Sequence, residues 1–293
     1  MAQLRSQRGA VDWMTAAPGI ASVTAPAAAT MALVALFVDA WGIQGGKGPD
    51  DMCPFKGCGS KQCGGPTTVH AMTCMKQALR GYHSTHTMQK RCLQRLLRQQ
   101  HVPWVTNEDA SVFSVADRRA DTAIGPGALS LAKDTTLQYE GVVVDSTVRA
   151  PVADYMLPPT AGARANAATK DGFAAAAGEK QKRKHHENCL LPQWRFVPFV
   201  QETFGRLGPA ARAFLRQVAS HSAAAQGGHT KVIERRAGIV YRHMLVALGA
   251  SLARELAERV FAYVRGARLA GWTAHPVLAI LTGSVTSSLP PLV

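Results

Sequence analysis

The stretch LQYEGVVVDSTV, residues 137–148, contains a continuous apolar run, Val142-Val143-Val144, which ends at Asp145. Such a run, bounded by polar residues, is typical of a strand buried on both faces of a sheet. A buried carboxylate is costly unless it is paired or used, so Asp145 is the most informative single residue of the chain. An Asp that closes a strand is also a common turn former, and that interpretation stays open here.

Short apolar stretches on either side of this run predict the rest of a small mixed sheet. The four expected strands lie near 102–106, 119–124, 139–147 and 194–200. Helical periodicity predicts helices within 75–101 and over 230–264, and Pro209 suits the first turn of another helix. The sequence therefore predicts an α/β fold in which helices flank the sheet and a helical segment follows at the C-terminal end.

The 293-residue chain is strongly basic, with 33 Lys and Arg against 19 Asp and Glu. The resulting net charge of +14 attracts polyanions, which are nucleic acids or anionic membrane surfaces. A GC-biased genome that favours arginine codons gives a similar composition. Hydrophobic residues make up 47% of the chain, which argues against wholesale disorder. The apolar run at 26–38 is shorter than the roughly 20 residues of a membrane helix, so we expect no membrane partner.

Four of the six cysteines lie close together and enclose a histidine. The candidate zinc ligands are Cys53, Cys58, Cys63, His70 and Cys74. A cluster of this kind is more typical of a structural zinc site in a reducing compartment than of disulfides, so we expect a nuclear or cytoplasmic protein. Zinc takes four ligands, so one candidate is spare, with Cys63 the first choice, and His83 and His86 are competitors. Free buried cysteines are the alternative.

The stretch 75–101 contains six Lys and Arg and no acidic residue. Apolar residues at helical spacing, from Met88 to Leu97, predict one buried stripe and one cationic face. A face without acids suits the phosphate backbone of DNA, although a solvated helix face is the simpler interpretation. The candidate nucleic-acid-binding residues are Lys90, Arg91, Arg95, Arg98, Arg118 and Arg119.

Carboxylates near the ends of the expected strands suggest hydrolytic chemistry. Phosphodiester hydrolysis uses divalent metal ions held by carboxylates, and a lysine can stabilise the charge that develops. The candidate catalytic residues are Glu108, Asp121, Asp145, Lys182 and Lys184.

In their order, these motifs resemble the C-terminal region of polyproteins from non-long-terminal-repeat retrotransposons. In that family a Cys-Cys-His-Cys knuckle precedes a restriction-enzyme-like endonuclease of the PD-(D/E)xK class. The resemblance runs from about residue 53 to 220. Its most specific phrases are RRADTAI (118–124), VVVDSTV (142–148) and FVPFVQETFG (196–205).

The resemblance implies that Asp121 and Asp145 are the two acids that bind a catalytic magnesium ion. It implies that the catalytic lysine comes from a following helix, at Lys182 or Lys184, and it matches Glu202 to a recurring acid. The matched knuckle ligands are Cys53, Cys58, His70 and Cys74.

This chain departs from the family pattern at four places, one of which is the stretched spacing of the knuckle ligands. Ala120 replaces the usual proline before the first acid. Thr147 stands where most enzymes of the class place their lysine, so activity would depend on the lysine from the helix. His185 or His186 stands where a tyrosine is common.

We therefore expect four segments: a helical leader at 1–49, a zinc knuckle with a basic helix at 50–101, a nuclease domain at 102–225 and a helical segment at 226–293. The expected function is magnesium-dependent nicking of DNA. The first alternative is a non-catalytic, zinc-stabilised remnant of a truncated retroelement that binds DNA or RNA. The second is a protein from a decaying reading frame without a partner.

Overall fold

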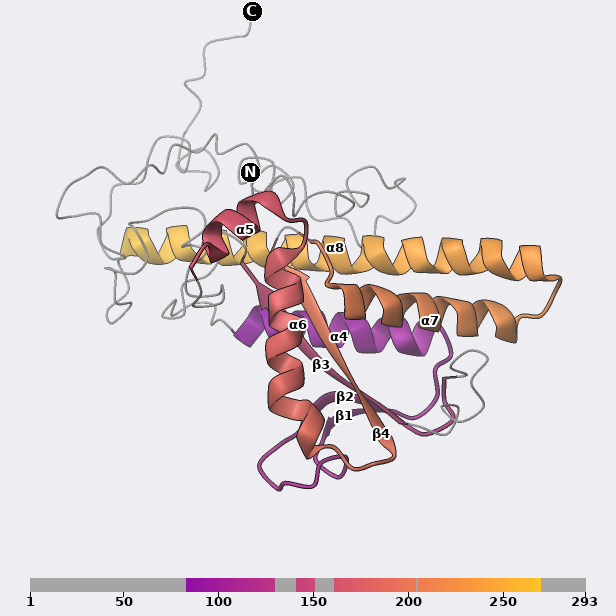
Figure 1. The fold of residues 1–293 in the computed structure, drawn as a ribbon. Helices are drawn as coiled ribbons and strands as arrows, with labels where there is room; N and C mark the ends of the chain where they lie inside the picture. Colours follow the sequence, from indigo (N-terminus) through magenta and orange to yellow (C-terminus); the bar gives the residue numbers. More distant parts are fainter. Residues whose placement is uncertain (1–82, 130–140, 151–160, 204, 270–293) are drawn as a thin grey trace, which may run out of the picture. The chain divides into compact units, whose positions relative to one another are not determined.

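The computed structural model describes residues 83–129, 141–150, 161–203 and 205–269 (Figure 1). The chain divides into two compact units. The described residues Thr85–Leu252 belong to the first unit, and residues 83–84 and 253–269 belong to the second. The sheet and the candidate site both lie in the first unit. The segment boundaries expected from the sequence stay predictions.

The described chain contains both helices and strands, and three consecutive strands are followed by a helical connection, a fourth strand and two further helices. The described elements are α4 (His83–Gln99), β1 (Val105–Asp109), β2 (Ala120–Ile124), β3 (Gly141–Arg149), α5 (Ala163–Thr169), α6 (Phe173–His186), the 3-10 helix η5 (Glu187–Cys189), β4 (Trp194–Glu202), α7 (Pro209–Ala225) and α8 (Thr230–Leu269). The helix expected to begin at Pro209 and the long helix that follows it are confirmed. No helix in this part of the chain combines the length and the apolar character needed to cross a membrane.

The four strands form one mixed sheet in the order β1-β2-β3-β4. Strand β2 pairs antiparallel with both β1 and β3, whereas β3 and β4 run parallel. Parallel neighbours need a crossover connection, and α5 and α6 lie between these two strands in the chain. The expected small mixed sheet with flanking helices is therefore confirmed.

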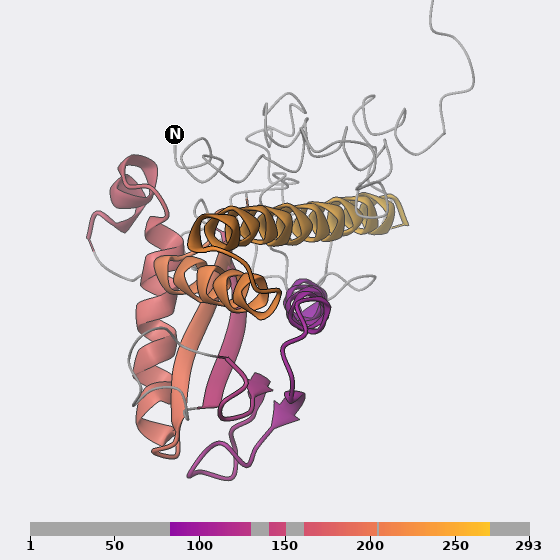
Figure 2. The same ribbon diagram turned by 90° about the vertical axis from the view of Figure 1, so that its right-hand side faces the viewer.

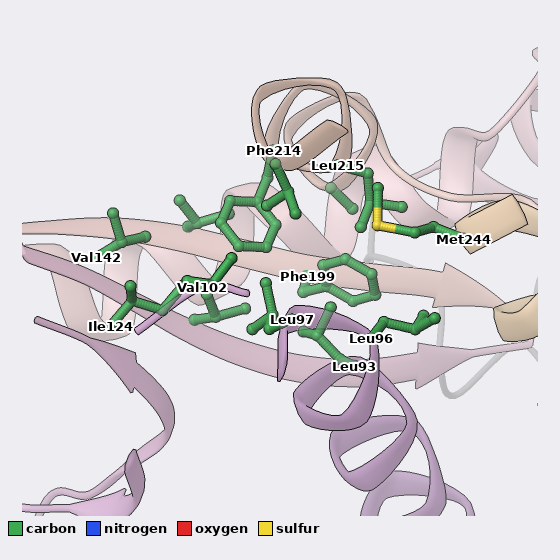
Figure 3. Packing of buried hydrophobic residues seen from close by; sticks show 14 of the residues in the cluster. Leu93, Leu96, Leu97, Val102, Ile124, Val142, Phe199, Phe214, Leu215 and Met244 are labelled. Atoms are coloured by element: carbon green, nitrogen blue, oxygen red, sulfur yellow. The ribbon is translucent and has the colours of Figure 1, made fainter. Parts of the chain in front are cut away.

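Helices α4, α7 and α8 lie on one side of the sheet (Figure 2). The larger of the two clusters of buried apolar side chains described here lies between these helices and the sheet. In Figure 3, Leu96 and Leu97 of α4 lie on one side of Phe199 of β4, and Phe214 of α7 lies on the other. The sheet contributes Val142 and other buried residues to this cluster.

The opposite face of the sheet holds a second, smaller cluster. There Val143 packs with Ala123, Phe196 and Phe113. Successive side chains of a strand point to opposite faces, so the valine run contributes to both clusters. The expected burial of this strand on both faces is confirmed.

The first strand begins three residues later than the sequence predicts. His101 adopts a φ of 58° and ends α4, and the amide of Val102 then donates to the carbonyl of Leu97. Val102 is therefore part of the helix cap and of the core instead of the sheet. Trp104 also has a positive φ, 50°, which is not an extended conformation, and β1 begins at the next residue.

Helix α6 lies close against β4, and two features fix its position. The buried carboxylate of Glu202, in β4, accepts a hydrogen bond of 3.1 Å from the amide of Ala175 in the first turn of α6. A side chain at Gly178 would come within 3.0 Å of a methyl group of Val200, so glycine allows the close approach. Glu202, the recurring acid of the family resemblance, thus positions α6.

The next helix, α7, is held in turn by an acid of α6. Gly208 precedes α7 and offers no side-chain cap, and the buried carboxylate of Glu179 accepts hydrogen bonds from the amides of Ala210 and Ala211, at 3.0 and 3.1 Å. We expect Glu179→Ala to lower the free energy of unfolding by about 1–3 kcal/mol, because two amides lose their acceptor. Glu179→Gln, which keeps one acceptor oxygen, should cost less. Urea denaturation measures both; equal stability of the Ala variant and the wild type would contradict this role.

Candidate metal centre

The two aspartates singled out in the sequence lie on neighbouring strands and face each other. Thr122 of β2 pairs with Val144 of β3, and the same register places Asp121 opposite Asp145. Both project from the face that carries Val143, because the side-chain period of a strand is two. The Cβ atoms of opposite residues lie about 4.5–5.5 Å apart. The side chains of Asp121 and Asp145 are only 12% and 10% exposed, so the two carboxylates share a nearly enclosed site.

A histidine from α4 completes this group. The Nε2 atom of His86 lies 2.9 Å from Oδ2 of Asp121. The same oxygen accepts a hydrogen bond of 2.7 Å from the amide of Ser146, which fixes the carboxylate. His86, Asp121 and Asp145 each offer one ligand atom, and these atoms lie within 4.8 Å of one another. The group could hold a metal ion, and we call His86, Asp121 and Asp145 together the metal centre.

The donor set fits a divalent cation. Magnesium is usually held by one or two carboxylates and several waters. Manganese accepts the same carboxylates, and imidazole is a common ligand of the heavier divalent metals. Two carboxylates that face each other repel in the absence of a cation, and a bound ion would relieve that repulsion.

Helix α6 brings a lysine to the second aspartate. Nζ of Lys182 lies 2.7 Å from Oδ2 of Asp145. Burial alone would raise the pKa of Asp145, but the contact with His186 and the charge of Lys182 hold the pKa of this carboxyl well below its usual range. Asp145 is therefore ionised at neutral pH. Of the two lysines left open by the sequence, Lys182 reaches the metal centre, whereas Lys184 is exposed.

His186, one helical turn after Lys182, is the second contact of Asp145 from α6. Its Nε2 atom lies 3.0 Å from Oδ2 of Asp145, and its ring stacks on Phe196. The guanidinium of Arg118 lies 3.3 Å from Nδ1 of the same ring. Because a guanidinium only donates hydrogen bonds, Nδ1 accepts, and the proton of a neutral ring is then on Nε2, the atom next to Asp145. Arg118 also donates to the carbonyl of His185.

Several residues expected at the site or on the DNA-binding surface lie elsewhere. Glu108 pairs with Lys90, and this hydrogen bond holds the pKa of Glu108 below its usual value. Glu108 is therefore not part of the metal centre, and Lys90, at 8% exposure, is no surface cation. Arg118 positions His186 instead of extending into solvent.

The remaining arginines expected to contact nucleic acid are exposed. They are Arg91, Arg95 and Arg98 on α4, and Arg119 before β2. The predicted zinc ligands Cys53, Cys58, Cys63, His70 and Cys74 lie outside the described residues, so the zinc knuckle stays a prediction. His86, considered as a competitor for zinc, belongs to the metal centre.

No known family model, curated protein or solved structure matches this chain significantly. The family resemblance therefore remains an interpretation of the sequence motifs. What can be inferred about function rests on the geometry of the metal centre and on the chemistry of its neighbours.

Proposed function

We propose that this chain is a metal-dependent endonuclease that nicks DNA by phosphodiester hydrolysis, on a fold of the PD-(D/E)xK class. One observation carries the proposal: Asp121, Asp145 and the amine of Lys182 converge, although they come from two strands and a helix. Two carboxylates and a lysine are the groups that this chemistry needs. The fold, a small mixed sheet with flanking helices, agrees with the proposal.

Each residue of the site has a chemical task in this proposal. A bound magnesium ion would activate water and neutralise charge on the phosphate. Asp121 and Asp145 would hold that ion with His86, and the amide of Ser146 keeps Asp121 in place. The ammonium of Lys182 would stabilise the negative charge that develops on the phosphate oxygens.

The position of Lys182 supports the class despite the missing lysine of β3. Thr147 lies two residues after Asp145, and both side chains therefore project from the same face of the strand. Helix α6 packs on β3 and β4 (Figure 1). From this helix, Lys182 contacts Asp145. Helix α6 thus supplies the lysine charge that is missing at the position of Thr147 in β3.

DNA is the proposed partner, and the exposed arginines of α4 suit its backbone. Arg91, Arg95 and Arg98 project from one side of the helix that also carries His86. Phosphate contacts release counterions, so DNA binding should weaken steeply as the salt concentration rises. The zinc knuckle and a nuclear or cytoplasmic location remain parts of the same proposal.

Nicking of supercoiled plasmid tests the proposal. We expect the wild type to nick in magnesium and to stop when EDTA is added. Lys182→Met should lower the nicking rate about 100-fold, because a buried charge next to the reacting phosphate is lost. Lys184→Met, which removes the same charge two residues away, should keep the rate within about threefold.

Two results would contradict the proposal. One is the absence of magnesium-dependent nicking by a folded wild-type protein over the background of the Asp145→Ala variant. The other is an equal nicking rate for Lys182→Met and the wild type, which would show that Lys182 does not stabilise the charge on the phosphate. Circular dichroism of each variant checks that the fold is retained.

A further inference from the structure

The helical hairpin of α7 and the first part of α8, residues 209–249, is a strongly basic element away from the metal centre. It contains six Lys and Arg and a single acid, Glu234. Two of the arginines have contacts within the hairpin. Arg236 donates to the carbonyl of Gly227 in the connecting loop, and the guanidinium of Arg216 lies 5.4 Å from the centre of the Tyr241 ring. These contacts tie the two helices together.

Three other cations of the hairpin form a line on α8. At 3.6 residues per turn, Lys231, Arg235 and Arg242 fall within about 40° of one another around the helix axis. All three are exposed, and within the described part of the chain none has an ion pair or hydrogen bond. Arg235 and Arg242 are about 10 Å apart along the axis. Such a line of free charges matches a row of phosphates better than a set of internal ion pairs.

Gly238 lies in the same line, between Arg235 and Arg242. Glycine in the interior of a helix is unfavourable relative to alanine. A side chain at Gly238 would meet nothing within 4 Å, so internal packing does not require a glycine there. The missing side chain leaves the helix backbone open between two cations, where a flat or extended partner can approach closely.

The apolar residues next to the line distinguish between two possible anionic partners, a membrane surface and a nucleic acid. Only Val232 and Ile239 are large and exposed on this part of α8, at 42% and 62%. A helix that lies in a membrane surface needs a broad apolar face opposite its cations. Here the opposite face is buried in the core through Met244 and Leu248. The surface therefore suits a nucleic-acid backbone and not a lipid surface.

We infer that the line Lys231, Arg235, Gly238 and Arg242 of α8 is a second docking surface, which binds the phosphate backbone of duplex DNA. This inference rests on the proposed function for the choice of DNA as the partner. The surface would bind DNA by its backbone, independently of base sequence.

Fluorescence anisotropy with a labelled duplex of about 30 base pairs tests this surface, without added magnesium and at several salt concentrations. We expect the triple variant Lys231→Gln, Arg235→Gln, Arg242→Gln to bind at least about tenfold more weakly, and the slope of log K against log salt to become shallower by about 2–3, since each phosphate contact contributes about 0.9. Gly238→Gln should weaken binding several-fold although it raises the melting temperature.

The matched control removes the same charge from scattered exposed positions, with Lys170→Gln, Lys180→Gln and Arg254→Gln. If this control changes the salt slope as much as the line variant does, DNA binding depends only on the net charge of the protein, and the docking surface is refuted. Full DNA affinity of the line variant, or tighter binding of the wild type to anionic vesicles than to DNA, would also overturn it. Because catalysis plays no part in a binding measurement without magnesium, an inactive nuclease and an unused surface give different results.

Discussion

Asp121→Asn is expected to lower the rate of magnesium-dependent nicking at least about 10³-fold, and Asp145→Asn should do the same. Each exchange replaces a charged ligand of the metal centre by a neutral one of the same shape. The double variant should be scarcely slower than either single one, because residues that act as one unit give non-additive losses. Plasmid nicking under single-turnover conditions gives the rates, and titration with manganese reports the loss of metal affinity.

Asp109→Asn is the matched control for this experiment. Asp109 ends β1 and its carboxylate accepts hydrogen bonds from Ser111, at 2.9 Å from the amide and 2.6 Å from the hydroxyl. The exchange removes one carboxylate charge without touching the metal centre, so the nicking rate should stay within about threefold of wild type. A rate of Asp121→Asn equal to that of the control would show that the two facing aspartates hold no catalytic ion.

Phe214→Ala is expected to lower the free energy of unfolding by about 3–5 kcal/mol, the range found for large aromatic side chains in cores. Phe214 is 1% exposed, and its ring meets that of Phe199 edge-on, with centroids 6.4 Å apart. Its loss leaves a cavity between α7 and the sheet. Single domains are stable by about 5–15 kcal/mol, so the variant could lose a large part of the total.

Ser220→Ala, at an exposed position of the same helix, serves as the comparison and should change the stability by less than about 0.5 kcal/mol. Urea denaturation followed by circular dichroism measures both variants. A loss below about 1 kcal/mol for Phe214→Ala would mean that α7 does not pack on the sheet as described. Neither variant touches the metal centre, so the nicking rate of the folded fraction should be unchanged.

The sheet and its two aspartates could be predicted because their signals are local. An apolar run with an acid at its end marks β3 and Asp145, and period-two alternation is enough to place Asp145 on one face with Val143. Asp121 lies at the start of the strand expected at 119–124, and the family resemblance marks it as the first acid. That the two acids face each other depends on the register of β2 against β3, and this register cannot be derived from a short stretch of sequence.

The helical period of 3.6 residues is enough to show that Lys90 is buried and that Lys182, not Lys184, faces the sheet. Lys90 lies three residues before Leu93 and seven before Leu97, so it shares their buried face and could not be a surface cation. Gly178, Lys182 and His186 recur every fourth residue, which marks the side of α6 that meets the sheet and selects Lys182 over Lys184.

His86 could not be assigned from the sequence. It lies 35 residues before Asp121, and their contact depends on how α4 packs against the sheet. Nothing in its immediate neighbourhood distinguishes it from His83, and both were weighed only as ligands for zinc. The same holds for Arg118, whose contact with His186 spans 68 residues.

The parallel pairing of β3 and β4 has a consequence for how the protein becomes active. Asp145 precedes the crossover and Lys182 lies within it, so the two meet only when the connection has folded back and β4 has joined the sheet. Closing such a long loop is a late and slow event in folding. In a chain still emerging from the ribosome, Asp121 and Asp145 are thus without Lys182 until the last strand has docked.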